Sequence, residues 1–452
     1  FWLKPFFCTP LSPRARPSEE GRPSLPAMLP RLSSVPIDVL LVLLVMLVVE
    51  VGLPGADFCW GRGLRRVAFG LLVGSMVARS LAQASESPSR LSRAADLRKT
   101  TRSGTVQSME WASVEMQGWR PTMEDATCVV GSLPAPLMQQ ALFAVFDGHG
   151  GPEVSRIASQ SFPEVLAACA RELCEAGGPA AAAGGSSAAA LALRWLLGEE
   201  ETADRPGAGA GKAEADSRSE CVGKSLHLAM LRMDEDLRER GGGGSAACAA
   251  CPSSGSRSPR RNDFYRTGST ALVVLVDLGE DAGGPRRLTV ANCGDSRAVL
   301  CRGGRARDLS EDHKPELPAE EQRIKRAGGY VAPSGQTFRI DGRGLNLSRA
   351  LGSFRYKSRP DLPPERQKVS CLPQITFLEL EEADEFVVLG CDGIFDLNTS
   401  QGAVDLVRGS LREGRSVAEA AGLLVDRSCS PDVRASRGRG GDNCSAVVVK
   451  LR

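Results

Sequence analysis

The sequence predicts an α+β domain in which helices pack outside paired strands. Apolar runs of strand length alternate with amphipathic stretches, and glycine-containing turns separate many of them. The strand-like runs are 105–116, 141–146, 271–278, 287–293, 298–302, 386–391 and 446–451. The helix-like stretches are 151–175, 224–238, 318–327 and 416–429.

Residues 1–104 read as a leader, and residues 105–452 as the folded domain. The apolar run 39–49 has the length of a signal-peptide core, and a second run, 67–78, ends near the small-x-small pattern Ala82-Gln83-Ala84. We therefore expect targeting to the secretory pathway or membrane association through this leader. The alternative is a cytoplasmic or nuclear protein to which upstream sequence has been wrongly joined. The Ser/Arg-rich stretch 85–103 is expected to be a polar linker.

The first half of the domain contains two contrasting strands and two helices. Residues 105–116 alternate partly, whereas 141–146 (ALFAVF) carries no charge and is expected to be fully buried. Apolar residues recur at helical intervals in 151–175 and again in 224–238. His227 lies beside the apolar stripe of the second helix, and we expect no catalytic role for it.

Two stretches of low complexity interrupt the domain. Residues 177–220 are rich in Ala and Gly, with one short helical patch at 188–197, and residues 241–262 are rich in Gly, Ser and Arg. Such compositions bury too little apolar surface to require packing, so both are predicted to be insertions.

Strand signals dominate the second half of the domain. Turns containing Gly294-Asp295 and Gly303-Gly304 separate three of the strands. The helix 318–327 begins with proline and is followed by two glycines, which are typical start and stop signals.

Overall composition excludes some classes of function. The formal net charge is only +2, so nothing indicates a polyanion-binding surface or a nucleic-acid partner. The 14 cysteines lack the spacing of a disulfide framework, and Cys248 and Cys251 have no second pair at zinc spacing. Cys293 and Cys391 lie within strand-like motifs and are predicted to be small buried apolar residues.

The most informative stretch is DGHGG at 147–151, directly after the buried run 141–146. A strand end there presents the carboxylate of Asp147, the carbonyl of Gly148 and the ring of His149 together. Carboxylates and backbone carbonyls are ligands for hard cations, so the stretch suits a metal site. A hairpin turn stabilised by an aspartate would explain residues 146–151 (FDGHGG) alone about equally well.

Further motifs, one upstream of DGHGG and the others downstream, occur in a fixed order and decide between these interpretations. They are MQGWRPTMEDA at 116–126, GSTA at 268–271, NCGDSR at 292–297, DHKP at 312–315, LSRALG at 347–352, CDGIFD at 391–396 and GDN at 441–443. Together with DGHGG, this series resembles the type 2C family of metal-dependent protein serine/threonine phosphatases. The resemblance extends from Thr105 to Arg452 apart from the two insertions. It sharpens the expected fold to two antiparallel sheets sandwiched between helix layers, with a dinuclear metal site at one end.

The acidic residues of these motifs all lie at expected strand ends or turns. Converging carboxylates repel one another and take up protons unless cations neutralise them, so the cluster itself implies divalent metal. Ligation by oxygen alone favours Mg²⁺ or Mn²⁺ over Zn²⁺. The candidate residues are Glu124, Asp125, Asp147, Asp295, Asp392, Asp396 and Asp442.

The resemblance implies a role for each of these residues. Asp147 resembles the ligand that bridges two metals, with the Gly148 carbonyl on one of them. On the other metal, Glu124, Asp392 and Asp442 resemble ligands, and Asp125 a ligand through water. Asp295 and Asp396 match positions that, with Asp392, hold a weaker third ion. Arg120 resembles the residue that binds the phosphate, since a guanidinium offers paired donors, and His149 the general acid for the leaving oxygen.

The implied activity is the hydrolysis of phosphoserine and phosphothreonine in protein substrates by direct attack of a water shared by two Mg²⁺ or Mn²⁺ ions. The catalytic domain is expected to be monomeric. A catalytically weak scaffold of the same fold, a cation-binding module and a metallonuclease are the alternatives. The presence of every principal ligand together with Arg120 weighs against the scaffold, and Arg120 and His149 beside the acids weigh against the cation-binding module. The absence of a basic stripe near the motifs weighs against the metallonuclease.

One position departs from the family pattern. The family usually has Asp after Arg-Ala-Leu-Gly, and here Ser353 takes that place. No metal ligand is expected at this position. A substrate flap is expected at 330–344, where Pro333, Gly335 and Gly342 indicate a loop.

Overall fold

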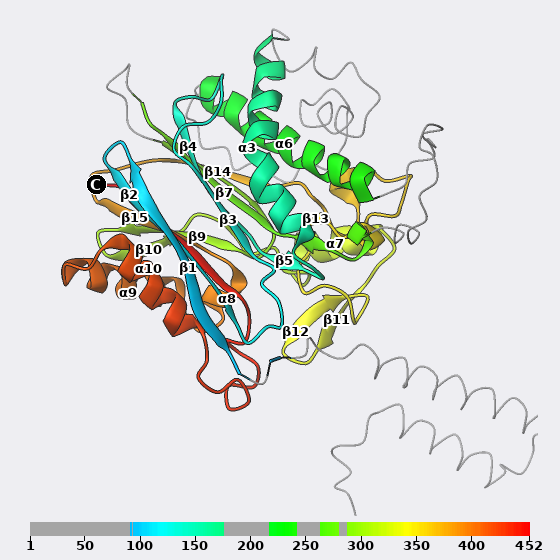
Figure 1. Ribbon diagram of the computed structural model, residues 1–452. Coiled ribbons are helices and arrows are strands. Elements are labelled where there is room, and N and C mark those ends of the chain that lie inside the picture. Colours follow the sequence, from blue (N-terminus) through cyan, green and yellow to red (C-terminus); the bar gives the residue numbers. More distant parts are fainter. Residues whose placement is uncertain (1–90, 93, 176–216, 242–262, 280–286) are drawn as a thin grey trace, which may run out of the picture. The chain divides into compact units, whose positions relative to one another are not determined.

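A computed structural model describes residues 91–92, 94–175, 217–241, 263–279 and 287–452, all within one compact unit, Pro88–Arg452 (Figure 1). The predictions for 39–49, 67–78 and 188–197 fall outside these residues, as do most of the expected insertions 177–220 and 241–262. Among the helices that are described, none combines the length and the apolar character needed to cross a membrane.

Most of the described strands belong to two antiparallel sheets. One has the order β1-β2-β16-β15-β9-β10, and the other the order β14-β8-β7-β4-β3. The first consists of β1 (Asp96–Val106), β2 (Met109–Gly118), β16 (Cys444–Lys450), β15 (Asp384–Gly390), β9 (Arg297–Arg302) and β10 (Arg305–Asp308). The second consists of β14 (Gln374–Glu379), β8 (Arg287–Cys293), β7 (Ala271–Asp277), β4 (Gln140–Phe146) and β3 (Ala126–Val130).

Strand β4 shows why the central strands lack the usual alternation of apolar and polar residues. Its odd-numbered residues Phe143 and Val145 join the core that contains the apolar residues of β2, β15 and β16. Its even-numbered residues Leu142 and Ala144 join a second core with the helices on the other side. Both faces are buried, so the whole run is apolar.

Helices cover the outer face of each sheet. Helices α3 (Glu153–Glu175) and α6 (Ser217–Gly241) pack on the five-stranded sheet, where Phe162 and Met230 belong to the second core. Helices α9 (Ser400–Arg412) and α10 (Val417–Ser428) pack on the six-stranded sheet and belong to the first core. Figure 1 shows the two pairs of helices on opposite sides of the strands. The predicted four-layer α-β-β-α sandwich is confirmed.

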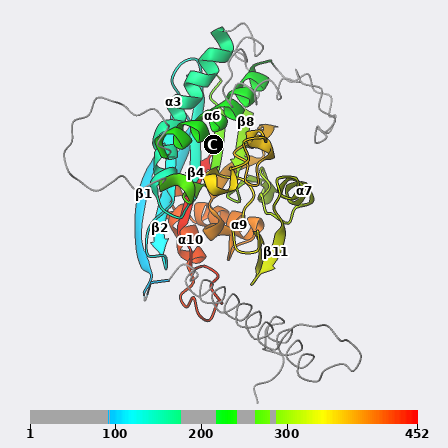
Figure 2. The same cartoon turned by 90° about the vertical axis from the view of Figure 1, so that its right-hand side faces the viewer.

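Smaller elements surround one end of the sandwich. A three-stranded sheet has the order β13-β6-β5 and joins Leu351–Gly352, Gly268–Ser269 and Gly148–His149. Helix α7 (Pro318–Arg326) and the hairpin of β11 (Val331–Ser334) with β12 (Thr337–Ile340) lie on the side away from β1 and β2 (Figure 2). The short helix α8 (Asp392–Phe395) follows β15 directly, and three-residue 3₁₀ turns occur at Asp263–Tyr265, Phe354–Tyr356 and Pro364–Arg366.

Four sequence expectations need correction. The expected linker 85–103 is wrong for residues 96–103, which belong to β1, and the expected strand 105–116 is two strands with a turn at Gln107. Strand β1 is an edge strand with mostly exposed side chains, so no apolar pattern marks it. Helix α6 begins at Ser217, inside the expected insertion 177–220. The expected flap loop is largely a β-hairpin.

Candidate active site

The candidate residues gather where strands of both sheets begin or end. Arg120 follows β2, Asp147 follows β4 and Asp392 follows β15, while Asp125 precedes β3 and Asp442 precedes β16. Antiparallel pairing of β2 with β16 and of β3 with β4 brings these ends to the same side of each sheet. The architecture thus converts positions far apart in the sequence into one acidic cluster.

Arg120 contributes a positive charge to this cluster. Its Nη2 lies 2.5 Å from Oδ2 of Asp442. Burial alone would lower the pKa of Arg120, but the charges of Asp442, Asp392 and Asp147 raise it above its ordinary value. The guanidinium is therefore charged, partly exposed and close to three carboxylates.

Asp147 is held at the centre by its backbone. Its N–H donates to Oγ1 of Thr270 (3.0 Å), and its carbonyl accepts from the Thr270 N–H (2.8 Å). Burial, followed by the charges of Asp125 and Asp392, raises the pKa of Asp147 well above its usual range. Without a cation, this carboxylate competes with its neighbours for protons.

Asp392 and Asp396 lie at the two ends of helix α8. Burial raises the pKa of Asp392 well above its ordinary value, and the charges of Asp295 and Asp442 raise it further. Burial and Asp442 also raise the pKa of Asp396. Both residues of the CDGIFD motif therefore belong to the same electrostatic cluster.

Asp125 is buried, and its Oδ2 has no hydrogen-bond partner among the described residues. Ligand atoms of Asp125, Asp147 and Cys391 lie within 4.8 Å of one another. Burial is the largest cause that raises the pKa of Asp125 to about 7. Cys391 donates to the Asn443 carbonyl (3.4 Å), and burial raises the pKa of its thiol well above the ordinary value. The thiol therefore stays protonated, and the available donors are oxygens.

A lysine whose function the sequence did not indicate completes the cluster. Nζ of Lys314 lies 2.5 Å from Oδ2 of Asp295, which is only 2% exposed. Burial alone would lower the pKa of Lys314, but Asp295 and Asp392 raise it above its ordinary value. The DHKP motif marked this lysine without assigning it a partner, because the contact depends on the turn between β8 and β9.

The backbone of Glu124 lies against the DGHGG turn, beside the acidic cluster. Its carboxylate accepts hydrogen bonds from the Gly151 N–H (3.2 Å) and from Oγ1 of Thr122 (2.9 Å), while its own N–H donates to Oδ1 of Asn443 (2.9 Å). A Cβ at Gly148 would lie 2.2 Å from the Glu124 carbonyl, so only glycine fits there. The structure thus joins Glu124 and Gly148 closely, with the carboxylate directed to the DGHGG turn.

His149 is half-buried and is bound to the residue that departs from the family pattern. Its Nε2 lies 2.6 Å from Oγ of Ser353, and its Nδ1 is buried without a hydrogen-bond partner in the described part of the chain. Burial, with smaller effects of Arg355 and Lys357, lowers the pKa of His149 to about 4. No feature of the sequence pattern links position 149 with position 353.

The donor set fits divalent cations. The buried carboxylates raise one another's pKa, and one buried oxygen of Asp125 lacks a partner. Native proteins rarely leave buried polar atoms unsatisfied unless a ligand or ion fills the site. Oxygen donors of this kind suit Mg²⁺ or Mn²⁺ better than Zn²⁺.

Comparison with known proteins identifies the family. The family model described as protein phosphatase 2C matches residues 109–176 and 231–436. The chain belongs to the protein phosphatase 2C family. This membership makes it a metal-dependent protein phosphatase of the serine/threonine class.

Curated members of the protein phosphatase 2C family resemble the chain over most of its length. It is 32% identical to probable protein phosphatase 2C 11 of Oryza sativa subsp. japonica, over 78% of this chain and 88% of the relative. It is also 32% identical to protein phosphatase 2C 1 of Paramecium tetraurelia, over 78% of this chain and 96% of the relative. The crystal structure of serine-threonine phosphatase 2C from Toxoplasma gondii covers 78% of this chain and 99% of its own, with 19% identity and a TM-score of 0.53, and supports the fold.

Proposed function

We propose that the protein hydrolyses phosphoserine and phosphothreonine in proteins, with two Mg²⁺ or Mn²⁺ ions held by Asp147, the Gly148 carbonyl, Glu124, Asp392 and Asp442. Asp125 would hold one of them through water, and Asp295 and Asp396 would add ligands for a weaker third ion. The observation that carries this proposal is a cluster of buried, mutually repelling carboxylates beside one guanidinium.

Arg120 and His149 would have different roles, the first in binding the phosphate and the second in proton transfer. Arg120 would bind the oxygens of the phosphate through paired N–H donors, since Asp442 already orients its guanidinium. His149 would protonate the leaving oxygen. Its ring is neutral at pH 7 before substrate binds, because its pKa is lowered to about 4, and a bound phosphate dianion would favour the protonated form. When bound, the ions would lower the pKa of a water molecule and neutralise the phosphate charge.

The test uses the full chain and a phosphoserine peptide. Activity should require Mn²⁺ or Mg²⁺ and disappear in chelator. Asp392→Asn should abolish turnover because it removes a buried ligand charge. Asp405→Asn, an exposed aspartate on α9, is the matched control and should behave as wild type. Full turnover in chelator, or a fully active Asp392→Asn variant, would refute the proposal.

The same assay distinguishes the proposed phosphatase from a catalytically weak scaffold of the same fold. A scaffold would bind Mn²⁺ and melt cooperatively without releasing phosphate from the peptide. The targeting role of 39–49 and 67–78 and the monomeric state also stay predictions. Sequencing the mature N-terminus and size-exclusion chromatography would test them.

A further inference from the structure

The small sheet β13-β6-β5 aligns three motifs in one row. His149 pairs with Gly268, and Gly268 pairs with Gly352 on its other side. Ser353 follows Gly352 directly, and its Oγ reaches across Gly268 to lie 2.6 Å from Nε2 of His149. The contact joins residues 204 positions apart through three very short strands.

Gly268 makes this contact sterically feasible. A Cβ on Gly268 would lie 2.5 Å from Nε2 of His149 and 2.5 Å from Oγ of Ser353. Any side chain at this position would therefore separate the ring from the hydroxyl. The backbone of β6 is shaped so that these two groups meet.

Ser353 itself is tightly constrained. It is fully buried and has a φ of 51°, in the left-handed region that residues other than glycine, asparagine and aspartate seldom adopt. Its N–H donates to the Thr267 carbonyl (2.8 Å). A strained residue that the surroundings hold in place is typical of functional sites.

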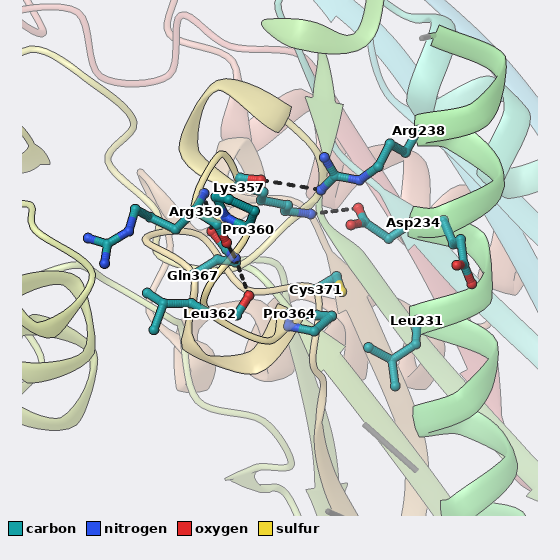
Figure 3. A pocket seen from close by; sticks show the side chains of 11 residues that line it. Leu231, Asp234, Arg238, Lys357, Arg359, Pro360, Leu362, Pro364, Gln367 and Cys371 are labelled. Carbon is teal, nitrogen blue, oxygen red and sulfur yellow. Dashed lines mark hydrogen bonds and ion pairs between the residues drawn. The ribbon is translucent and has the colours of Figure 1, made fainter. Parts of the chain in front are cut away.

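A buried ion pair between Asp234 of α6 and Lys357 supports the same turn. Oδ1 of Asp234 accepts the Gly352 N–H (2.8 Å) and lies 2.5 Å from Nζ of Lys357, which also donates to the Ala350 carbonyl (2.8 Å). Figure 3 shows Lys357 reaching from its loop toward Asp234 on the helix (Figure 3). Both side chains are almost inaccessible to solvent, so the position of Ser353 is set from both sides.

We propose that Ser353 is a positioning residue that holds His149 by its Nε2 and leaves Nδ1 for proton exchange with the leaving oxygen. The inference rests on the acid role given to His149 under the proposed function. A buried nitrogen without a partner is unfavourable unless a ligand meets it, and Nδ1 is such an atom among the described residues. In contrast to the aspartate expected from the family pattern, the hydroxyl brings no charge. Its contribution is therefore orientation of the ring.

Kinetics on two substrates test the proposal. Ser353→Gly removes the hydroxyl and relieves the left-handed strain, so it should fold at least as well as Ser353→Ala. Both variants should lower kcat for a phosphoserine peptide by about 10–100-fold, as loss of a supporting hydrogen bond typically does. Nitrophenyl phosphate, whose leaving group needs no proton, should be hydrolysed at nearly the wild-type rate. Ser358→Gly, at an exposed position in the same loop, is the matched control.

A double variant distinguishes positioning of His149 by Ser353 from an independent effect of Ser353 on the reaction. His149→Gln should slow the peptide reaction strongly and the nitrophenyl reaction little. Ser353→Gly added to His149→Gln should cause no further loss, because residues that act as a unit are not additive. A loss in the double variant equal to the product of the two single losses would overturn the proposal. Equal losses of Ser353→Gly on both substrates would also overturn it.

Nitrogen NMR provides a readout that does not depend on activity. The chain has three histidines, so the ring nitrogens of His149 can be assigned beside those of His227 and His313. In metal-free protein, Ser353→Gly should shift the Nε2 resonance of His149 and leave the other two histidines unchanged. An unchanged His149 spectrum would overturn the proposal. A wild-type protein inactive on the peptide would refute the proposed function and this inference with it, whereas an active one with unaffected Ser353 variants would refute the inference alone.

Discussion

At the scale of single residues, a few cationic side chains neutralise part of the negative charge of the active-site carboxylates. Arg120 and Lys314 each lie against a buried or half-buried aspartate, Asp442 and Asp295 respectively. These two positive charges offset part of the repulsion, while burial and then the charges of Asp125 and Asp392 still raise the pKa of Asp147. An excess of negative charge of this kind favours the binding of divalent cations.

Arg120→Lys tests whether Arg120 acts through the paired N–H donors of its guanidinium or only through its positive charge. Lysine keeps the positive charge but cannot offer paired donors to a phosphate. We expect kcat/KM for the phosphopeptide to fall by about 10²-fold, equivalent to about 2.7 kcal/mol, with little change in Mn²⁺ affinity. Steady-state kinetics and Mn²⁺ titration measure the two quantities. Wild-type kcat/KM in the variant would show that charge alone suffices.

His227 on α6 lies outside the active site and gives a pH prediction. Burial lowers its pKa from 6.5 to about 4 in the folded protein, although its Nδ1 lies 3.1 Å from the Gly223 carbonyl. The unfolded chain therefore binds the proton more readily below pH 6.5, so stability is full above that pH and falls as the pH approaches 4. His227→Gln should lose about 1–3 kcal/mol less stability than wild type between pH 7 and pH 4.

Urea unfolding at pH 7 and at pH 4–5, with wild type and variant side by side, measures this difference. Activity at pH 7.5 should be the same in both proteins. Identical pH dependence of the two unfolding free energies would show that His227 is not a source of acid sensitivity.

At the scale of secondary-structure elements, β1 is the element that matters most for defining the folded domain. It pairs with β2 from Asp96 to Val106, and Lys99 on it forms an ion pair with Asp426 of α10. Its exposed side chains add little apolar burial, but its backbone covers the edge of β2. An uncovered edge strand is a template for aggregation.

Two truncations should therefore behave differently. A chain of residues 88–452 should keep wild-type activity, whereas a chain of residues 105–452 should melt roughly 3–5 °C lower, equivalent to about 2–4 kcal/mol, and should aggregate more readily. Both chains keep every candidate catalytic residue, so activity per folded molecule should be similar. Thermal melting and light scattering make the comparison. Equal melting temperatures would show that β1 adds no stability.

The same elements show what could and could not be predicted from the sequence. Strand β4 was predicted nearly to its ends because burial on both faces leaves an uninterrupted apolar run, and β8 was predicted at its observed bounds. Strand β1 was missed because its exposed side chains carry no periodic signal.

At the site, Asp147, Asp392 and Asp442 could be grouped because each adjoins a strand in a recognisable motif. The structure brings them together with Arg120, Asp125, Asp295 and Asp396. The contacts of Lys314 with Asp295 and of Ser353 with His149 could not be predicted, because they depend on side-chain directions across tertiary contacts.

At the scale of the whole molecule, two sheets share one acidic cluster at their ends. The cluster therefore opposes the packing that the apolar cores favour, since each sheet contributes carboxylates that repel those of the other. Asp125 and Asp147 adjoin strands of the five-stranded sheet, while Asp392 and Asp442 adjoin strands of the six-stranded sheet. Cations would join the two sheets.

Metal should accordingly stabilise the entire fold. At a concentration 100 times its dissociation constant, one bound ion adds about 2.7 kcal/mol, so Mn²⁺ should raise the melting temperature measurably over that in chelator. Asp392→Asn should reverse the order of stability. In chelator it should melt above wild type because a buried repulsive charge is gone, and with Mn²⁺ it should gain less. Calorimetry in the two buffers tests this, and an equal Mn²⁺ response in both proteins would contradict a ligand role for Asp392.

The position of β16 has a consequence for biosynthesis. This strand is the last in the sequence, yet it lies between β2 and β15 near the middle of its sheet, and Asp442 immediately precedes it. A nascent chain that ends before Cys444 therefore holds β1-β2 and β15-β9-β10 as two separate pieces, each with an open edge. We therefore expect a nascent chain to stay inactive until β16 has been synthesised and can pair with both β2 and β15.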